Sequence, residues 1–370
     1  MRLTGTYALL RRAGARLALL ALLLLVVAGC AGAGEELASV EWPTSTPREQ
    51  GLDPGAVRRY LRRIEAGGYG DIDSLLVVRD GTLAVERYFG AYGRETLHPV
   101  YSVTKSVTSL LVGQASDGGD FPDLDTPLLS LFPEYTELEN VDARKKAITL
   151  DDVLTMRAGF AWDEQAVSYT DPRNPVAQLL RSSDWFEHVL GLPMEARPGE
   201  EFRYNSGCSI LLGAVLRKAT GVEPETFAER ELFEPLGIQR HEWEAGPSGV
   251  ANTGWGLSLR PRDMAKLGQL VLDGGEWHGE RLVSRDWLAA STAPRASLGP
   301  DVAYGYQWWI LRGDRPGDAD LVAAIGWGGQ LVVVAPSLDV VVVSTGADYE
   351  SGREGALAFV REFLRDAVEK

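Results

Sequence analysis

Apolar and polar positions divide the chain into strand-rich ends and a helix-rich middle. Residues 72–90 contain two β-rich runs that flank Asp80 and Gly81, a pair that favours the tight turn of a β-hairpin. Four more strand-like runs follow towards the C-terminus: YGYQWWILRG, LVAAIGW, GQLVVVAP and DVVVVSTG. Several links between these runs are too short for crossovers. The pattern therefore predicts one sheet, mostly antiparallel, built from both ends of the chain.

Helical spacing predicts helices around the sheet and between its two halves. Near the N-terminal end, Val57, Leu61 and Ile64 recur on one face behind Asp53, which precedes a proline and suits a helix cap. A closing helix is predicted in EGALAFVREFLRDAVE. Further helices are predicted in NPVAQLLRSSDWFEHVL, CSILLGAVLRKATG and PRDMAKLGQLVLDGG.

These elements predict a single α+β domain over residues 49–370. Its sheet part comprises about residues 49–115 and 298–370, and a large helical region is inserted at about 116–297. The sheet is mostly antiparallel, comes from both chain ends and is flanked by helices. This length and apolar content are sufficient for a substantial core.

The N-terminal residues have the features of a targeting segment. A basic start, an apolar run and small residues before Cys30 are typical of a secretory signal, and the run is short for a membrane span. The sequence VAGC resembles a bacterial lipobox, which implies lipidation of Cys30. We expect a signal peptide at residues 1–29, a lipid-anchored tether at 30–48 and export to the bacterial cell envelope. The alternative is an ordinary signal peptide with a chance cysteine.

The charge, cysteine and histidine content of the chain argues against several kinds of binding partner and against a disulfide. Removing residues 1–29 leaves 33 basic and 52 acidic residues, a net charge of −19, which argues against a nucleic-acid partner. The only other cysteine, Cys208, has no partner once Cys30 is lipidated, so no intrachain disulfide is expected. The four histidines show no metal-ligand spacing and no phosphate-binding loop is present, so we expect no metal or nucleotide.

The stretch YSVTKSVTSLL, residues 101–111, begins like a turn and continues as a helix. If Ser102 starts that helix, Lys105 lies one turn later on the same face. A serine becomes a good nucleophile when a neighbour takes its proton. A helix N-terminus and burial both destabilise an ammonium, which allows a lysine to act as that base. The alternative is a serine cap followed by a solvated lysine.

Two later stretches supply candidate partners for this pair. Tyr204, in PGEEFRYNSGCSILLGAVL, precedes a predicted helix, and its phenol can shuttle a proton to a leaving group. The glycine-rich corner in AAIGWGGQLVVVAP can present a backbone N–H to a developing oxyanion. Gly326 and Gly328 would let a substrate approach the main chain closely. The alternatives are a tyrosine packed at a helix start and a plain β-turn.

The order of these motifs resembles the serine β-lactamase-related superfamily. The similarity covers about residues 49–368 and includes LTMRAGFAWDE, PGEEFRYNSG, WGLSLRPRDMAKLGQLVLDGG and YGYQWWI. Specifically, the chain looks like the class C β-lactamase branch, which includes 6-aminohexanoate-dimer hydrolases and family VIII esterases. The resemblance implies a β-lactamase/transpeptidase-like fold, a small-molecule ester or amide substrate, and no cofactor.

The resemblance also implies roles for individual residues. Ser102 corresponds to the acylated nucleophile, Lys105 to its base and Tyr204 to the second proton-transfer group. The superfamily's oxyanion hole uses the backbone N–H of the nucleophile and one from the glycine-rich strand. These positions correspond here to Ser102 and Trp327.

Substrate contacts are expected in the stretch AVSYTDPRN. By resemblance to the dimer hydrolases, Tyr169 lies in a segment that contacts substrate, and Asp171 would receive a substrate amine. Trp255, Trp308 and Trp309 would line the cleft or pack in the core.

Two departures from the superfamily pattern bear on the substrate. Where class C β-lactamases have Tyr-x-Asn, this chain has Ser206 in the asparagine position, which we count with Gly326 and Gly328 as substrate-binding. The third motif reads AAIG and lacks the Lys or His that meets a substrate carboxylate. Losing that contact costs about 1.5–3 kcal/mol, or roughly 10- to 100-fold in affinity. We therefore expect weak or no β-lactamase activity, unless an arginine from elsewhere supplies the charge.

Three function classes remain after these observations. The first is a serine hydrolase of esters or amides, and the second is a D-Ala-D-Ala carboxypeptidase or β-lactamase. The third is a catalytically silent envelope protein that binds a partner. The joint presence of Ser102, Lys105 and Tyr204 favours catalysis, and the lack of a G-x-S-x-G motif argues against an α/β-hydrolase.

Overall fold

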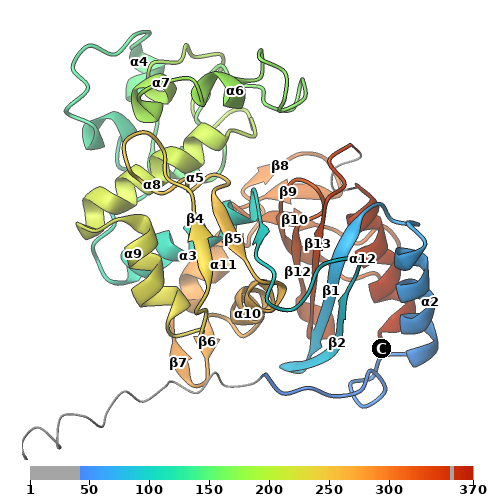
Figure 1. The fold of residues 1–370 in the computed structure, drawn as a ribbon. Coiled ribbons are helices and arrows are strands. Elements are labelled where there is room, and N and C mark those ends of the chain that lie inside the picture. The colour runs from blue at the N-terminus through green and yellow to red at the C-terminus, as the bar shows by residue number, and fades with distance from the viewer. Residues whose placement is uncertain (1–41, 351–353, 370) are drawn as a thin grey trace, which may run out of the picture. The chain divides into compact units, whose positions relative to one another are not determined.

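The N-terminal hairpin and the C-terminal strands form one sheet, as the sequence predicts (Figure 1). The structure is a computed structural model and describes residues 42–350 and 354–369. Within these residues the large sheet has the strand order β2-β1-β13-β12-β11-β10-β9-β8, and neighbouring strands run antiparallel. The strands are β1 (Ile72–Arg79), β2 (Thr82–Tyr88), β8 (Ala296–Ser297), β9 (Val302–Tyr304), β10 (Trp309–Leu311), β11 (Leu321–Ile325), β12 (Leu331–Ala335) and β13 (Val340–Gly346).

The turn between β1 and β2 has the backbone that its two residues favour. Asp80 and Gly81 have φ angles of 48° and 67°, the left-handed values of a two-residue primed turn. β13 pairs with β1 on one side and with β12 on the other. The first and last parts of the chain therefore meet inside the sheet rather than at its edge.

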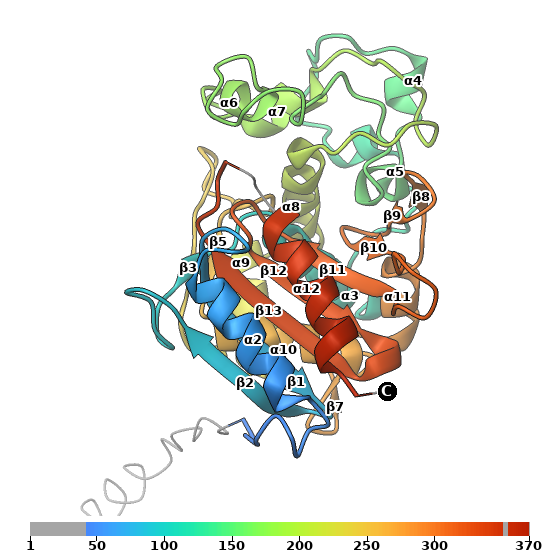
Figure 2. The same ribbon diagram turned by 90° about the vertical axis from the view of Figure 1, so that its right-hand side faces the viewer.

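Helices cover both faces of the sheet. α2 (Pro54–Glu65) and α12 (Glu354–Ala367) pack together on one face, and α10 (Pro261–Leu272) packs against β1, β12 and β13 on the other (Figure 2). Every residue of β13 is buried, as expected for a strand that is covered on both sides. Asp53 caps α2 as predicted, and its side chain accepts a hydrogen bond from the Gly55 N–H at 2.7 Å.

The remaining helices lie mainly between the two halves of the sheet. They are α3 (Val103–Asp117), η1 (Leu128–Leu131), α4 (Ala143–Lys146), α5 (Leu150–Leu154), α6 (Pro175–Leu179), α7 (Trp185–Leu190), α8 (Ser206–Thr220), α9 (Pro224–Ala228), η2 (Glu229–Phe233), α11 (Arg285–Ser291) and η3 (Pro336–Leu338). α3 packs against α8 and β11, and so joins the helical region to the sheet. Across the described residues, every helix is too short or too polar to cross a membrane.

Two small sheets lie mainly in the part of the chain that was predicted to be helical. β3 (His98–Pro99), β5 (Leu257–Leu259) and β4 (His241–Trp243) form one of them, in that order, and β6 (Glu276–Trp277) pairs with β7 (Glu280–Arg281) in the other. These strands were not predicted from the sequence, because runs of two or three residues are too short to show an alternating pattern.

The predicted tether at residues 30–48 ends earlier than expected, because residues 42–48 pack onto the domain. Trp42 is buried, and its indole N–H donates to a carbonyl of the β1–β2 turn at 2.8 Å. Thr44 forms a parallel bridge to β2. The Pro, Ser and Thr content suggested a linker, but one buried tryptophan provides enough apolar contact to fix these residues. The earlier part of the tether, the signal peptide and Cys30 lie outside the described residues.

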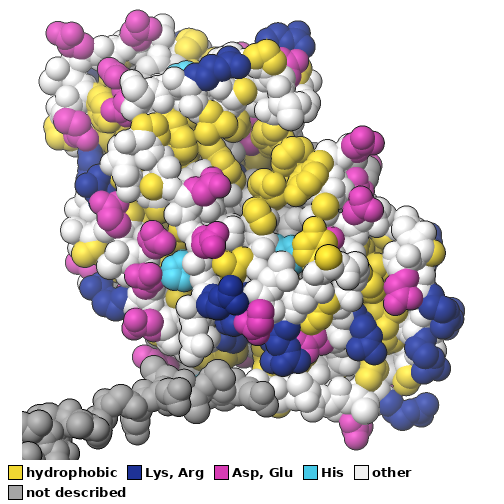
Figure 3. Space-filling model, in the orientation of Figure 1, with side chains coloured by type: hydrophobic (Ala, Val, Ile, Leu, Met, Phe, Trp, Pro, Cys, Tyr) yellow, Lys and Arg dark blue, Asp and Glu magenta, His cyan; other side chains and the backbone are white. Residues whose placement is uncertain are grey.

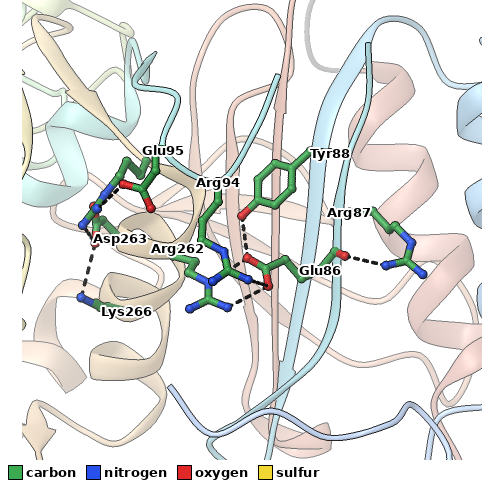
Figure 4. Close-up of polar contacts among 9 residues, drawn as sticks. Glu86, Arg87, Tyr88, Arg94, Glu95, Arg262, Asp263 and Lys266 are labelled. Atoms are coloured by element: carbon green, nitrogen blue, oxygen red, sulfur yellow. Dashed lines mark hydrogen bonds and ion pairs between the residues drawn. The ribbon is translucent and has the colours of Figure 1, made fainter. Parts of the chain in front are cut away.

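Charged side chains join β2 to α10 (Figure 4). The Arg262 guanidinium donates to both carboxylate oxygens of Glu86, at 2.7 and 2.8 Å, and Arg94 donates to the same carboxylate at 3.1 Å. A two-point arginine–carboxylate contact fixes orientation as well as separation. α10 directly follows β5, whose Leu257 N–H donates to the Thr104 hydroxyl of α3 at 3.2 Å, so the strand before α10 lies next to α3.

Candidate active site

The residues around Ser102 leave β3 through a strained turn and enter α3. Tyr101 has a φ of 47°, a left-handed conformation that bulky residues rarely adopt. Its ring packs against Trp327, at 5.5 Å between centroids, and against Tyr349, at 6.0 Å. Strain of this kind persists where the surrounding structure holds it, and it is common at functional sites. Ser102 follows as the N-cap residue of α3, so the predicted helix start is confirmed.

Lys105 lies one turn into α3 with its amine next to Ser102. Its Nζ donates to three oxygens: Ser102 Oγ at 3.0 Å, Ser206 Oγ at 3.0 Å and the Gly254 carbonyl at 2.7 Å. The residue is 1% exposed. Burial lowers the pKa of Lys105 from 10.5 to about 8, although the Glu164 carboxylate opposes the shift. The amine can therefore lose its proton near neutral pH, as a base for Ser102 must.

Tyr204 lies beside this pair, just before α8. Its ring stacks on Trp309 at 5.6 Å between centroids, and the Lys105 Nζ lies 5.1 Å from its centroid, over the ring. The residue is buried and lines a cavity together with Ser102. Packing thus fixes the ring with its electron-rich face towards the amine, an arrangement that stabilises the lysine once it is protonated.

The glycine-rich corner follows β11 and runs beside the nucleophile. A Cβ on Gly326 would lie 2.3 Å from the Val100 carbonyl oxygen, so the corner can approach the residues before Ser102 only with glycine at this position. Gly328 has a φ of 80°, and a Cβ there would lie 2.7 Å from the Tyr349 ring. Both glycines thus allow close packing of the chain itself, and the close approach of a substrate to them stays a prediction.

Two cavities meet at Ser102, and both are also lined by Tyr169 and Trp327. The larger has a volume of about 490 Å³. Its lining includes Tyr204 and Gly326, and three carboxyl side chains also line it. The acidic side chains are Glu164, Glu350 and Glu354.

The smaller cavity is mainly apolar and has a volume of about 230 Å³. Its lining also includes Ser206, which contacts Lys105. Its apolar lining consists of Tyr101, Tyr169, Val176, Leu180, Trp255 and Trp327. Figure 3 shows hydrophobic side chains gathered on this face between the helical region and the sheet. Among the described residues that line the two cavities there is no arginine, lysine or histidine.

Of the residues predicted to contact substrate, Tyr169 and Trp255 line the cavities next to Ser102 and Asp171 does not. Tyr169 packs against Trp327 at 5.5 Å between centroids and lines both cavities. The Arg173 guanidinium lies 2.6 Å from the Asp171 carboxylate. Hydrogen bonds from Arg173 lower the pKa of Asp171 to about 2. Neither cavity includes Asp171 in its lining, and its contact with a substrate amine stays a prediction. Trp255 lines the apolar cavity.

The other two tryptophans have the structural role that the sequence left open. Trp308 is 1% exposed and Trp309 is 5% exposed, and both belong to the core. Trp309 still contributes to the site, because it holds the Tyr204 ring from behind.

Glu164 is a site residue that the sequence analysis missed. It is 1% exposed, and its carboxylate contacts Ser206, which in turn contacts Lys105. Glu164 lies 42 residues before Ser206 in the chain. No local motif reports a contact of this kind, since it depends on how the loop between α5 and α6 folds back.

Among the residues that the structure describes, one cluster of potential metal ligands lies outside the two cavities. Glu225 and Glu229 on consecutive turns of α9 and η2 face His241 of β4, and their ligand atoms lie within 4.8 Å of one another. The imidazole lies 3.6 and 3.4 Å from the two carboxylates. The sequence shows no metal-ligand spacing here because the histidine comes from a different element than the two glutamates. These distances also suit a simple ion pair, and none of the three residues lines the cavities next to Ser102.

The antiparallel sheet with a buried lysine bonded to a serine at the start of α3 defines an α+β serine hydrolase. The chain belongs to the Beta-lactamase family, whose sequence profile matches residues 58–363. It is 26% identical over 293 residues to the 6-aminohexanoate-dimer hydrolase of Paenarthrobacter ureafaciens, which covers 73% of this chain and 71% of that protein.

Two solved structures show how far the fold is shared. The structure titled "EstCE1, a hydrolase with promiscuous acyltransferase activity" has a TM-score of 0.69 at 17% identity, covering 84% of this chain and 98% of that one. The octameric penicillin-binding protein homologue of Pyrococcus abyssi has a TM-score of 0.66 at 19% identity, covering 86% and 79%. The β-lactamase/transpeptidase-like fold predicted from the sequence is confirmed.

Proposed function

We propose that this protein hydrolyses esters or amides of small molecules through an acyl-enzyme on Ser102. The observation that carries the proposal is the 3.0 Å contact between Ser102 Oγ and the buried Lys105 amine. Neutral Lys105 takes the serine proton as Oγ attacks the substrate carbonyl. The proton then passes, with the help of Tyr204, to the departing alcohol or amine. A water molecule cleaves the acyl-enzyme by the same steps in reverse order, which releases the acid and restores Ser102.

Negative charge develops on the carbonyl oxygen in both steps. We assign its stabilisation to the backbone N–H groups of Ser102 and Trp327. The close packing of Gly326 on Val100 supports this assignment, because it brings the corner next to the start of α3. Both residues line the same two cavities.

The substrate proposed is one with an uncharged, apolar acyl group. The apolar cavity beside Ser102 supports it, as does the lack of a cation in the described lining of both cavities. The relationship to a 6-aminohexanoate-dimer hydrolase supports activity on the amide bond of a small molecule. A D-Ala-D-Ala carboxypeptidase or β-lactamase would need a partner for the substrate carboxylate, so we expect penicillin to acylate Ser102 slowly or not at all.

The proposal is tested by treating the full-length protein with a fluorophosphonate probe. Ser102 Oγ would attack phosphorus, fluoride would leave, and Lys105 would take the serine proton. Mass mapping is expected to find the adduct on Ser102, and Ser102→Ala is expected to remain unlabelled. A folded wild-type protein that forms no adduct would support the silent binding protein instead.

The apolar cavity predicts a preference for longer acyl chains. Each additional methylene that enters it contributes up to about 0.8 kcal/mol, roughly fourfold in kcat/KM. In Trp255→Ala the preference for hexanoate over acetate is expected to fall by about tenfold, since much of the contact area is lost. The measurement is kcat/KM for p-nitrophenyl esters that differ only in the acyl group. Leu298→Ala, a change at an exposed leucine outside the cavities, serves as the control and should leave the preference unchanged.

We also propose that the protein is exported and anchored to the cell envelope through a lipid on Cys30. The support is the signal-like segment and the VAGC sequence. Metabolic labelling with radioactive palmitate is expected to mark the wild-type protein and not Cys30→Ser. Equal labelling of both proteins would exclude this anchor.

A further inference from the structure

We propose that Glu164 is a positioning residue that aims the lone pair of neutral Lys105 at Ser102, acting through the hydroxyl of Ser206. The inference rests on the proposed function and adds a residue to it. Glu164 comes from the loop between α5 and α6, whereas Lys105 and Ser206 come from α3 and α8. Three separate parts of the chain therefore meet around the Ser206 hydroxyl.

Four hydrogen bonds hold the Glu164 carboxylate in one orientation. Its Oε2 accepts from the Trp162 indole N–H and from the Ser206 backbone N–H, each at 2.7 Å. Its Oε1 accepts from the Ser206 hydroxyl at 2.8 Å and from the Tyr169 hydroxyl at 3.0 Å. A carboxylate can only accept. The single proton of the Ser206 hydroxyl is therefore committed to Glu164.

This commitment fixes the polarity of the contact between Ser206 and Lys105. Ser206 Oγ has only lone pairs to offer to the Lys105 Nζ, 3.0 Å away. The Gly254 carbonyl, at 2.7 Å, is likewise only an acceptor. A neutral amine has two N–H bonds and one lone pair. Because the two acceptors use both N–H bonds, the lone pair faces the remaining neighbour, Ser102 Oγ, at 3.0 Å.

Without the carboxylate, the Ser206 hydroxyl would be free to turn. It could then donate to Lys105 and occupy the lone pair that has to take the Ser102 proton. In Glu164→Gln the side chain keeps its shape but has one accepting atom in place of two, while the same four donors surround it. The variant therefore tests whether the direction of the hydrogen bonds from Lys105 to Ser206 and from Ser206 to Glu164 matters, with little change in side-chain volume.

Glu164 also acts on Lys105 by charge. The two bonds through Ser206 place its carboxylate less than about 6 Å from the amine. There it raises the pKa of Lys105, against the larger lowering caused by burial. The other ionisable groups that face the amine are Cys208 of α8 and Tyr204. Burial raises the pKa of the Cys208 thiol, so the thiol stays neutral over the pH range of the experiment described next.

The experiment follows the rate of fluorophosphonate labelling of Ser102 from about pH 6 to 10 in the full-length protein. In Glu164→Gln the midpoint of the rising limb is expected to move to lower pH by about one unit, because the charge that favours the ammonium is gone. The rate on the plateau is expected to fall at least about tenfold, since the lone pair is no longer aimed at Ser102. Glu164→Asp keeps the charge at a shorter reach, so its midpoint should stay and only its rate should fall.

Asp263→Asn is the matched control. Asp263 is also a fully buried carboxylate, paired with Arg260 of the same segment, and its loss should not move the midpoint. Each protein is tested below its melting temperature. An unchanged plateau rate or an unshifted midpoint in Glu164→Gln would overturn the inference, and so would an equal shift in the control. If the amide variant does not fold, an unchanged rate or a low-pH shift in Glu164→Asp would overturn it. Failure of the wild-type protein to label would instead overturn the proposed function.

Discussion

Lys105→Met is expected to lower kcat/KM for ester hydrolysis by about 10³- to 10⁴-fold. General base catalysis contributes about 10²–10⁴-fold, and this base also orients the serine through the 3.0 Å contact. Methionine has a similar length and no proton-accepting nitrogen, so the cavity next to Ser102 should be preserved. The measurement is kcat/KM with a p-nitrophenyl ester over a range of pH. A loss of less than about threefold would mean that under 1 kcal/mol of the barrier depends on Lys105, and the assignment would fail.

In the wild-type protein, the dependence of kcat/KM on pH should follow the titration of Lys105. Because burial lowers the pKa of Lys105 to about 8, the fraction of neutral amine rises with pH and levels off above that value. The rate should follow the same curve. The folded chain releases this proton near pH 8, whereas the unfolded chain retains it up to about pH 10.5.

The same difference makes a stability prediction. Between pH 8 and 10.5 the unfolded state binds more protons at Lys105, so the free energy of unfolding rises with pH in this window. The contribution is fully present above the window and lost as the pH falls through 8. It amounts to about 3 kcal/mol, since one pKa unit corresponds to about 1.4 kcal/mol. Lys105→Met should remove this slope, as measured by denaturant unfolding at a series of pH values.

Lys145 provides a matched control within the same chain. It is also buried, its Nζ donates to the Leu190 carbonyl at 2.6 Å, and burial likewise lowers its pKa to about 8. Lys145 lies in α4, outside the cavities next to Ser102. Lys145→Met should therefore remove a similar stability slope and leave kcat/KM unchanged. Comparing the two variants separates the effect of a buried amine on stability from the use of the Lys105 amine as a base in catalysis.

Local signals account for what the sequence predicted well. The β1–β2 hairpin follows from two residues with left-handed backbones, Asp80 and Gly81, between apolar runs. Ser102 and Lys105 are three residues apart in one helix, so their proximity needs only the helix. Whether the helix start was buried could not be read from the motif, and burial is what lowers the pKa of Lys105.

Features that depend on tertiary contacts were beyond local reasoning. Glu164 has a role only because a loop returns it to Ser206. Trp42 looked like part of a linker until its indole was seen bonded to the hairpin turn. In each case the deciding partner was invisible to a pattern of apolar and polar positions.

Gly326→Ala is expected to reduce kcat by about 10²- to 10³-fold while the protein remains folded. The added Cβ would lie 2.3 Å from the Val100 carbonyl oxygen, a backbone atom that cannot turn aside. The corner must therefore move away from the start of α3, and a displacement of about 1 Å can cost about 10²-fold in rate. If Trp327 supplies the second oxyanion contact, the loss falls on kcat rather than on KM, because that contact strengthens in the transition state.

The destabilisation in Gly326→Ala should be moderate, about 1–3 kcal/mol, as for other overpacked sites. Gly93→Ala is the control, because a Cβ at Gly93 would meet no atom within 4 Å. The decisive measurement is the separate change in kcat and KM at a temperature where both variants are folded. A rise in KM with kcat unchanged would show that the corner only binds substrate, and Trp327 would then have no part in stabilising the oxyanion. A fall in kcat alone would tie the packing of one glycine on Val100 directly to the chemistry at Ser102.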